Sequence, residues 1–574
     1  MIRGNITSWM GRQEAPLLTH LHLPPHARTG EAGVEIGGAV VLCPPLGREQ
    51  VASYRTLRQL GDALAGKGLL AVRLNWSGQA DSAPIDEGLG LLENWAADLA
   101  AVVTQLRAAG VQQVHLVGLR LGALVAAGQA AAVGADSLLL WDPVATGRNF
   151  LRHEQIMYAA EGLAHEEQDG FTALGYSLRP ADADQVRSLK LTTLLGELEG
   201  HDVVVGRLER GEANTQPGPD DRWTTSEMPE LLETSSMTAR VANHAISSIV
   251  TWCLARSGEH RSWVRLEPTL EARMVRDGVA LREQVVSLDG GLPGILTRRA
   301  DQDQAGEVGV LYVAASSEPM DGPSGLWALS AREVAAEGAV ALRMDKFGTG
   351  ELGGPLPTDP MPYMPGFVAD VAAGADFLTE LTGRRPVGVG LCSGAYFEMV
   401  GQNAARFESV VAINLLGFDR DPADIPDEVA MATDPSHVMV KAGDEDAPVQ
   451  LPLPLRQRAR REVKARMPQT AWRWLGRVGL AHAPDDFLRD AAAATDLVLA
   501  FSPDDFEAFR GQRGEAALDW ARRHGGPIRM SVDPLLDHGL FGAVGRRRAL
   551  QLVREEVARV RRSRSARAAE AVTA

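Results

Sequence analysis

The stretch Gly390-Leu391-Cys392-Ser393-Gly394 lies between a short apolar run, 387–390, and an Ala-containing segment with a helical pattern. Strand, glycine-flanked turn and helix is the setting of the pattern Gly-x-nucleophile-x-Gly, in which a strained turn lifts the central side chain clear of the backbone. Glycines suit such a turn because Cβ atoms beside the apex would crowd their neighbours. The pattern predicts that Cys392 is a nucleophile, with a buried structural cysteine as the alternative.

The partners that a cysteine nucleophile needs follow later in the chain. Asp504 and Asp505 come after one apolar run, and His538 comes after the next. A free thiol has a pKa of about 8.5, so a histidine must hold its proton and an aspartate must fix the tautomer of the imidazole. We therefore predict a triad of Cys392, His538 and one of the two aspartates. The spacing between strand and acid favours Asp505.

Backbone amides near the turn are expected to hold the oxyanion. The N–H of Ser393 directly follows the apex, and a second donor is expected from Ser316, in the loop after the first core strand of this half. Ser393 is a weaker candidate for the nucleophile because it lies one residue off the apex.

The two halves of the chain share a long repeat. The segment 67–78 returns 270 positions later as 337–348, and 118–122 returns 272 positions later as 390–394. A period of this length indicates a duplicated domain rather than a short stacked unit.

Each half alternates short apolar runs with longer helical patterns, which predicts an α/β fold with mainly parallel sheets flanked by helices. We place two domains at 1–258 and 263–562, with a basic tail at 563–574 that is expected to be solvated. Insertions at about 417–494 and, in the first half, at about 147–190 are expected to be lids over a pocket. Plain surface excursions are the alternative.

The first half departs from the catalytic pattern. Arg120 occupies its apex, and a guanidinium is always protonated and cannot attack an acyl carbon. No histidine occurs between His201 and His244, where a base is expected. We predict that this half is catalytically inactive. Arg120 either binds a carboxylate or phosphate of the substrate or forms a structural ion pair.

Composition excludes several classes of function. The net charge of the 574 residues is −16, which disfavours nucleic-acid binding. The N-terminus lacks the apolar core of a signal peptide, and no run reaches the ~18 apolar residues of a membrane span. Three widely separated cysteines, Cys43, Cys253 and Cys392, favour a reducing, cytoplasmic setting over a disulfide framework.

No cofactor and no metal site is expected. The run 348–353 fits the Gly-x-Gly-x-x-Gly pattern of dinucleotide sites. Prolines at 355, 357 and 360 follow it and exclude the helix that such a site needs.

Several motifs resemble the serine-aminopeptidase-like branch of α/β hydrolases, in particular the exosortase-system-associated hydrolases. They are Cys43-Pro-Pro-Leu-Gly47, Gly118-Leu-Arg-Leu-Gly-Ala123, Leu140-Trp-Asp-Pro-Val144 and Gly390-Leu-Cys-Ser-Gly-Ala395. The resemblance spans roughly 10–255 and 275–560, and it implies two tandem α/β-hydrolase-like domains of which the first is degenerate.

The function expected from these observations is acyl hydrolysis by a Cys-His-Asp triad. Its substrate is an ester, thioester or activated amide on a small molecule, a peptide or a carrier, because the fold hosts all of these chemistries. One alternative is an acyltransferase or cyclase that uses the same acyl-enzyme. The other is a non-catalytic pseudohydrolase that binds or scaffolds, with Cys392 merely packed.

Overall fold

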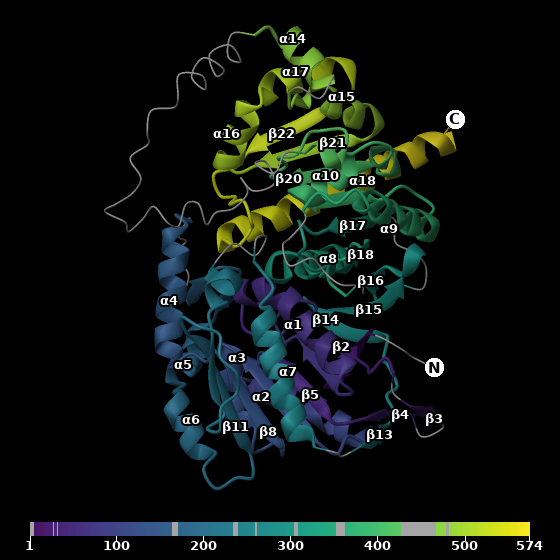
Figure 1. Ribbon diagram of the computed structural model, residues 1–574. Helices are drawn as coiled ribbons and strands as arrows, with labels where there is room; N and C mark the ends of the chain where they lie inside the picture. The colour runs from purple at the N-terminus through teal and green to yellow at the C-terminus, as the bar shows by residue number, and fades with distance from the viewer. Residues whose placement is uncertain are drawn as a thin grey trace, which may run out of the picture.

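The molecule consists of two α/β bodies stacked along one axis (Figure 1). The computed structural model describes residues 5–26, 28–30, 33–163, 170–233, 239–258, 261–302, 308–351, 362–425, 467–477 and 481–573. We call 5–264 the N-terminal body and 271–573 the C-terminal body. No helix among the described residues is long and apolar enough to cross a membrane.

The sheet of the N-terminal body has eight strands in the order β1-β2-β6-β5-β7-β8-β11-β12. They are β1 (Asn5–Gly11), β2 (Pro16–His22), β5 (Ala39–Cys43), β6 (Leu70–Leu74), β7 (Val114–Leu119), β8 (Ser137–Trp141), β11 (Val204–Arg210) and β12 (Arg222–Thr225). The pairs β1–β2 and β2–β6 are antiparallel, and the rest are parallel. Helices α1 (Arg48–Gly66) and α7 (Asn243–Ser257) pack on one face, and α2 (Leu91–Ala108) and α3 (Leu121–Gln129) pack on the other.

The sheet of the C-terminal body has nine strands in the order β14-β15-β16-β18-β17-β19-β20-β21-β22. They are β14 (Glu271–Arg276), β15 (Val279–Ser287), β16 (Pro293–Arg299), β17 (Gly309–Val313), β18 (Val340–Met344), β19 (Val387–Leu391), β20 (Ser409–Ile413), β21 (Asp496–Phe501) and β22 (Ile528–Val532). Helices α8 (Leu326–Ala336) and α18 (Ala543–Thr573) cover one face. The other face carries α9 (Phe367–Thr382), α10 (Ser393–Met399), α15 (Pro484–Ala494) and α17 (Gly514–His524).

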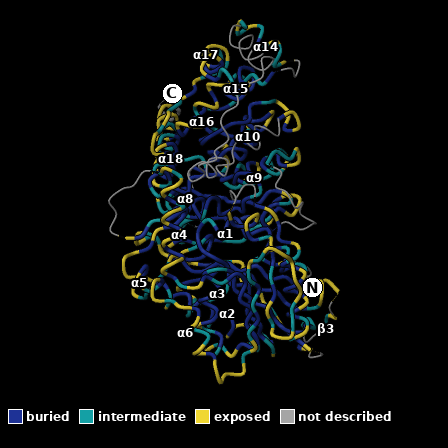
Figure 2. The backbone as a smooth tube through the Cα atoms, turned by 60° about the vertical axis from the view of Figure 1, so that its left-hand side comes forward, coloured by how far each residue is buried: buried dark blue, intermediate teal, exposed yellow. Residues whose placement is uncertain are grey.

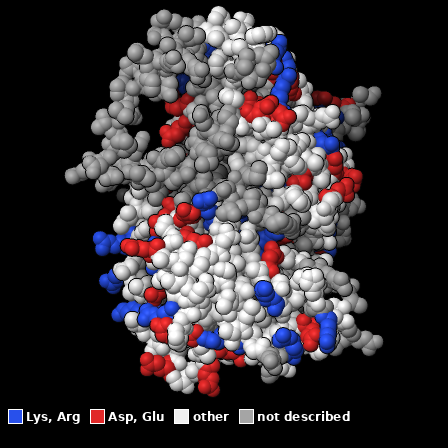
Figure 3. All heavy atoms as spheres, in the orientation of Figure 1, with Lys and Arg blue, Asp and Glu red and all other residues white. Residues whose placement is uncertain are grey.

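The two sheets have the same strand order once the extra edge strand β14 is set aside. The central strands are buried on both faces, as their continuous apolar runs predict. Figure 2 shows that burial continues from one body into the other. On the face in Figure 3, acidic and basic side chains are interspersed rather than gathered by sign.

Two segments differ from the domain limits expected from the sequence. Strand β13 (Ser262–Val264), expected to open the second domain, pairs with β4 (Gly33–Ile36) of the N-terminal body. The expected tail from 563 onward continues helix α18, where Arg564 is buried and pairs with Glu408.

The two expected insertions are built differently. That of the first half forms α4 (Gly147–Ala160), the hairpin of β9 (Phe171–Ala173) and β10 (Tyr176–Leu178), and α5 (Pro180–Ser188). In the second insertion, 426–466 lie outside the described residues, while α15 belongs to the helical layer of the sheet.

Reciprocal ion pairs join the two bodies. Arg73 on β6 donates to Glu351, and Nε of Arg343 on β18 donates to Asp81 at 3.0 Å. The two arginines are 270 positions apart, and so are the two acids. All four side chains are buried. Because a buried charge left without its partner costs about 3–5 kcal/mol, we infer that these pairs fix how the bodies meet.

The turn at 348–351, the described part of the glycine run, lies at this interface. Gly350 has φ 46°, and a Cβ atom there would lie 2.0 Å from the carboxylate of Asp345. The next residue is Glu351, the partner of Arg73. The turn at Gly350 therefore precedes and positions an interface carboxylate.

One buried carboxyl group lies beside strand β19 and pairs with no basic side chain of the described residues. Glu398 on α10 is fully buried, and no Lys, Arg or His among the described residues pairs with it. A Cβ atom on Gly388 would lie 2.9 Å from its Cδ, so that glycine makes room for the side chain. Burial raises the pKa of Glu398 well above its usual value, and the folded protein therefore holds this group protonated.

We expect Glu398→Gln to make stability less sensitive to pH. Above the ordinary glutamate pKa of about 4.3 the unfolded chain releases this proton while the folded protein keeps it. Wild-type stability should therefore fall as pH rises toward the raised pKa, by up to about 1.4 kcal/mol per pH unit from this group. Urea unfolding between pH 5 and 8 should show a smaller decrease for Glu398→Gln. Equal decreases in both proteins would contradict this assignment.

Candidate active site

Cys392 stands at the apex of a sharp turn between β19 and α10. Its backbone has φ 50° and ψ −116°, in the left-handed half of conformational space that non-glycine residues rarely occupy. A Cβ atom on Gly390 would lie 2.3 Å from the backbone N of Ala395, and one on Gly394 would lie 2.3 Å from the carbonyl O of Val313. Both flanking glycines are therefore required sterically, as the sequence pattern predicts.

The histidine and one of the two aspartates lie together beside this turn. Nδ1 of His538 is 2.7 Å from Oδ1 of Asp505, and both side chains are largely buried. Ser502 donates from Oγ to Oδ2 of Asp505 at 2.6 Å and fixes the carboxylate. Asp504, the other candidate, is exposed. The acid that contacts the imidazole is thus Asp505, in the first turn of α16 (Pro503–Gly511).

The electrostatics of His538 link it to Cys392. Burial lowers the pKa of His538, but the Asp505 carboxylate and the interaction with Cys392 raise it well above the usual value. Because Nδ1 faces Asp505, Nε2 is the nitrogen left for the thiol. The imidazole can therefore take and hold the thiol proton.

The two serines expected at the oxyanion site contact each other. The N–H of Ser316 donates to Oγ of Ser393 at 2.8 Å, and Ser316 has φ 41°. The N–H of Ser316, expected as the second oxyanion donor, therefore already has the Ser393 hydroxyl as its acceptor. The preceding loop is held by Lys346, whose Nζ donates to the carbonyl of Ala314 at 2.6 Å. Burial lowers the pKa of Lys346 to about 8.

Tyr363 is a site residue that the sequence does not reveal. Burial, and then its interaction with Cys392, raise its pKa well above the usual value, so the phenol stays protonated beside the thiol. Its ring packs edge-on against Tyr396, with 5.3 Å between the centroids. Tyr363 lies in a proline-rich stretch, and its counterpart in the first half, 79–94, contains no tyrosine, so the repeat does not indicate it.

Asn414 joins the two loops that carry the acid and the histidine. Its Nδ2 donates to the carbonyls of Asp537 and His538 at 2.9 and 3.0 Å. Its Oδ1 accepts from the N–H of Ser502 at 2.7 Å. The repeat could have indicated this residue, because Asn414 follows Asp142 by the same 272 positions that separate Cys392 from Arg120.

The N-terminal body has the same turn with an arginine at its apex. Arg120 has φ 56° and ψ −118°. Its Nε donates to Glu49 at 2.9 Å, and a terminal nitrogen donates to Asp142 at 3.2 Å. Arg210 also pairs with Asp142, at 2.7 Å. The guanidinium is therefore neutralised within its own body, which favours a structural ion pair over recognition of a substrate anion.

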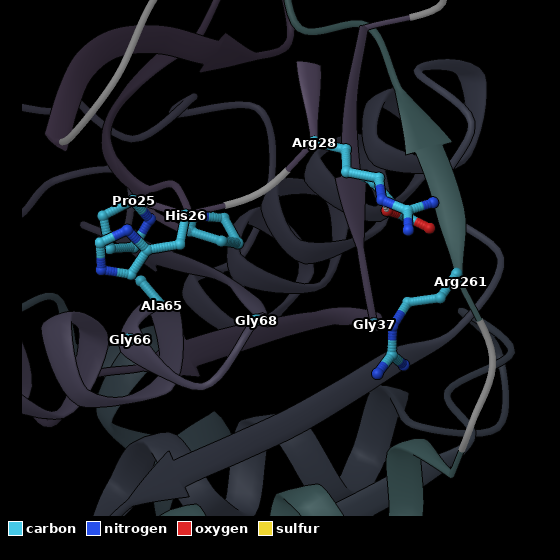
Figure 4. A pocket seen from close by; sticks show the side chains of 10 residues that line it. Pro25, His26, Arg28, Gly37, Ala65, Gly66, Gly68 and Arg261 are labelled. Atoms are coloured by element: carbon cyan, nitrogen blue, oxygen red, sulfur yellow. Dashed lines mark ion pairs between the residues drawn. The ribbon is translucent and has the colours of Figure 1, made fainter. Parts of the chain in front are cut away.

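Other reactive groups and cavities of the described residues offer no comparable arrangement. Cys43 and Cys253 lie in the core, where burial raises the pKa of both thiols, that of Cys253 to about 12. A cavity of about 270 Å³ near Pro25, His26 and Arg261 is lined by no cysteine or serine (Figure 4).

Comparisons with known proteins return structures but no sequence family. No family model matches the chain, and no curated protein matches it. Est1E from Butyrivibrio proteoclasticus, solved with ferulic acid bound, is 16% identical over 35% of this chain and 77% of that one, with a TM-score of 0.28. A dienelactone hydrolase from Anabaena variabilis is 14% identical over 48% of this chain and 96% of that one, with a TM-score of 0.29. An acetyl xylan esterase from a Paenibacillus species is 15% identical over 50% of this chain and 87% of that one, with a TM-score of 0.28.

The class of the fold follows from the structure itself. Each body is an α/β-hydrolase-like unit, with antiparallel strands leading into a parallel sheet and a sharp turn after the strand β7 or β19. The C-terminal body adds a histidine and an aspartate in hydrogen-bond contact beside that turn.

We expect Asn414→Asp to impair the reactivity of Cys392. The substitution keeps the acceptor for Ser502, removes both donors to the histidine loop, and places a carboxylate near Asp505. Two buried hydrogen bonds at about 1 kcal/mol each correspond to a decrease of at least about tenfold in the rate of Cys392 alkylation by iodoacetamide at neutral pH.

Asn403→Asp is the matched control. Asn403 is a buried asparagine whose Nδ2 also donates to two carbonyls, those of Val368 and Phe397, at 2.9 and 2.8 Å. This control should lose stability but keep the alkylation rate. If Asn414→Asp reacted as fast as wild type, Asn414 would have no role in placing the histidine.

Proposed function

We propose that the protein is an acyl hydrolase in which Cys392 attacks an ester, a thioester or an activated amide. The observation that carries the proposal is the contact of 2.7 Å between Nδ1 of His538 and Asp505, with Nε2 left for a thiol on a strained turn. A merely packed cysteine needs neither the turn nor the oriented imidazole.

The reaction follows from the positions of these groups. Nε2 of His538 takes the thiol proton as sulfur bonds to the acyl carbon, and the carbonyl π electrons move to oxygen. The backbone N–H of Ser393 and the phenol of Tyr363 supply the donors for this oxyanion, because the N–H of Ser316 already donates to the Ser393 hydroxyl. Its collapse expels the leaving group, which takes the proton from His538. Water then gives a proton to His538, attacks the thioester and releases the acid and the thiol.

We infer that the N-terminal body is a duplicated copy that has lost catalysis. The equal strand orders and the equal apex conformations support this interpretation. Cys392 and Asn414 correspond to Arg120 and Asp142, which pair with each other. Loss of the nucleophile thus coincides with a carboxylate that neutralises its replacement.

Removal of either the nucleophile or the base should abolish turnover of an activated thioester. We expect Cys392→Ala and His538→Ala each to lower kcat by several orders of magnitude, and the double variant to be little worse, because the members of a triad act as a unit. Cys253→Ala, in the core of the N-terminal body, is the control and should keep full activity. Single variants within about tenfold of wild type would exclude this site.

The cysteine itself favours one second candidate, transfer of the acyl group to an amine, because amines attack thioesters readily. In that case Cys392→Ser should keep part of the hydrolysis and lose a larger share of amide formation. Acid and amide products are measured from an activated acyl thioester with and without a panel of amines. If wild type forms only acid, and Cys392→Ser hydrolyses as fast, transfer is excluded.

A further inference from the structure

The loop that carries His538 is held on one side by the N-terminal body. The N–H of Gly175, in the hairpin between β9 and β10, donates to the carbonyl of Phe541 at 2.8 Å. The hydroxyl of Tyr158 on α4 lies 3.4 Å from the N–H of Ala543, which donates to it. Both contacts fall within five residues of the catalytic histidine candidate.

An apolar cluster accompanies these hydrogen bonds. The ring of Phe541, which is 9% exposed, packs with Val51, Tyr158 and Leu174 of the N-terminal body. Figure 1 shows α4 at the edge of the molecule, with one end beside the start of α18. Without the N-terminal body, this ring and the carbonyl of Phe541 would face water.

The C-terminal body holds the same loop at its other end. Asn414 binds the carbonyls of Asp537 and His538, and the Asp537 carboxylate accepts from the N–H groups of Phe541 and Gly542 at 2.7 and 3.0 Å. Leu540, between these anchors, has φ 54°, a conformation that non-glycine residues keep only when surrounding contacts impose it. The loop is thus a short strained turn clamped by both bodies.

The hairpin of β9 and β10 packs tightly against the loop that carries His538. Gly175 has φ 85°, and a Cβ atom there would lie 2.2 Å from Oγ of Ser324 and 3.1 Å from the ring of Phe541. Any side chain at this position must displace the loop or the segment that carries Ser324. The tightness of the contact makes the position of the loop sensitive to the N-terminal body.

We propose that the N-terminal body positions the histidine of the active site. It clamps the loop 537–543 through Gly175, Tyr158 and the cluster around Phe541. The clamp keeps the imidazole of His538 oriented toward the thiol of Cys392. These are positioning residues, since none of them touches the reacting atoms. The expected effect on turnover rests on the function proposed above, whereas the effect on the loop does not.

Gly175→Ala in the full chain tests the clamp, with Gly162→Ala as its matched control. Gly162 lies in the same insertion with φ 63°, and a Cβ atom there would meet nothing within 4 Å. Both variants therefore carry the strain of an alanine at positive φ, but only one presses on the histidine loop. The measurements are hydrogen–deuterium exchange of the peptide 537–543, alkylation of Cys392 at neutral pH, and turnover.

We expect Gly175→Ala to raise exchange in 537–543 and to lower Cys392 alkylation, each by about tenfold, as for a local opening made about 1.4 kcal/mol easier. Gly162→Ala should match wild type in both. Equal behaviour of the two variants, or wild-type values for Gly175→Ala, would overturn the proposal.

If Gly175→Ala does not fold, Tyr158→Phe tests the same clamp. It keeps the ring in the cluster and removes the acceptor for the N–H of Ala543, so exchange should rise about threefold or more, as expected for the loss of a modest hydrogen bond. Unchanged exchange would again contradict the clamp. If the exchange data support the clamp but the wild-type protein hydrolyses no acyl substrate, only the proposed function is contradicted. If turnover is normal both in wild type and in Gly175→Ala, only the positioning role is contradicted.

Discussion

The structure depends on one backbone constraint that occurs twice. Residues 120 and 392 follow the central strands β7 and β19 with φ of 56° and 50°, and the glycines beside them have no room for a Cβ atom. The fold thus imposes the same strained turn whatever side chain stands at its apex. In one body the apex presents a thiol to an imidazole, and in the other it presents a guanidinium to two carboxylates. The two bodies therefore share the backbone of the turn but differ in the chemistry of the side chain at its apex.

The candidate site is assembled from segments that are far apart in the chain. A small number of side chains hold these segments together. Asn414 links the segment of Asp505 to that of His538, and contacts from the N-terminal body reach the far end of the histidine loop. The reciprocal pairs of Arg73 with Glu351 and of Arg343 with Asp81 fix the bodies on which these contacts depend. The body with arginine at its apex thus contacts the loop that carries the histidine of the other body.

The sequence predicts those features that local pattern controls. Continuous apolar runs indicate the buried strands, and the order of Cys392, Asp505 and His538 follows from where strands end. Spacing favours Asp505 over Asp504 without deciding between them, because the helix that begins at Pro503 determines which carboxylate turns inward. Tyr363 and the ion pairs between the bodies depend on contacts between distant segments, which no local pattern records. The contact of Ser316 with Ser393 depends on the backbone turn at Ser316.

The central claim is that Cys392 forms a covalent acyl-enzyme with the help of His538. Its most direct test is intact-mass and peptide analysis of the full chain after brief exposure to an activated acyl thioester and acid quench. The account predicts a single acyl addition on the peptide that contains Cys392, absent in Cys392→Ala and strongly reduced in His538→Ala. No addition in wild type, or an addition on another residue such as Ser393, would contradict it.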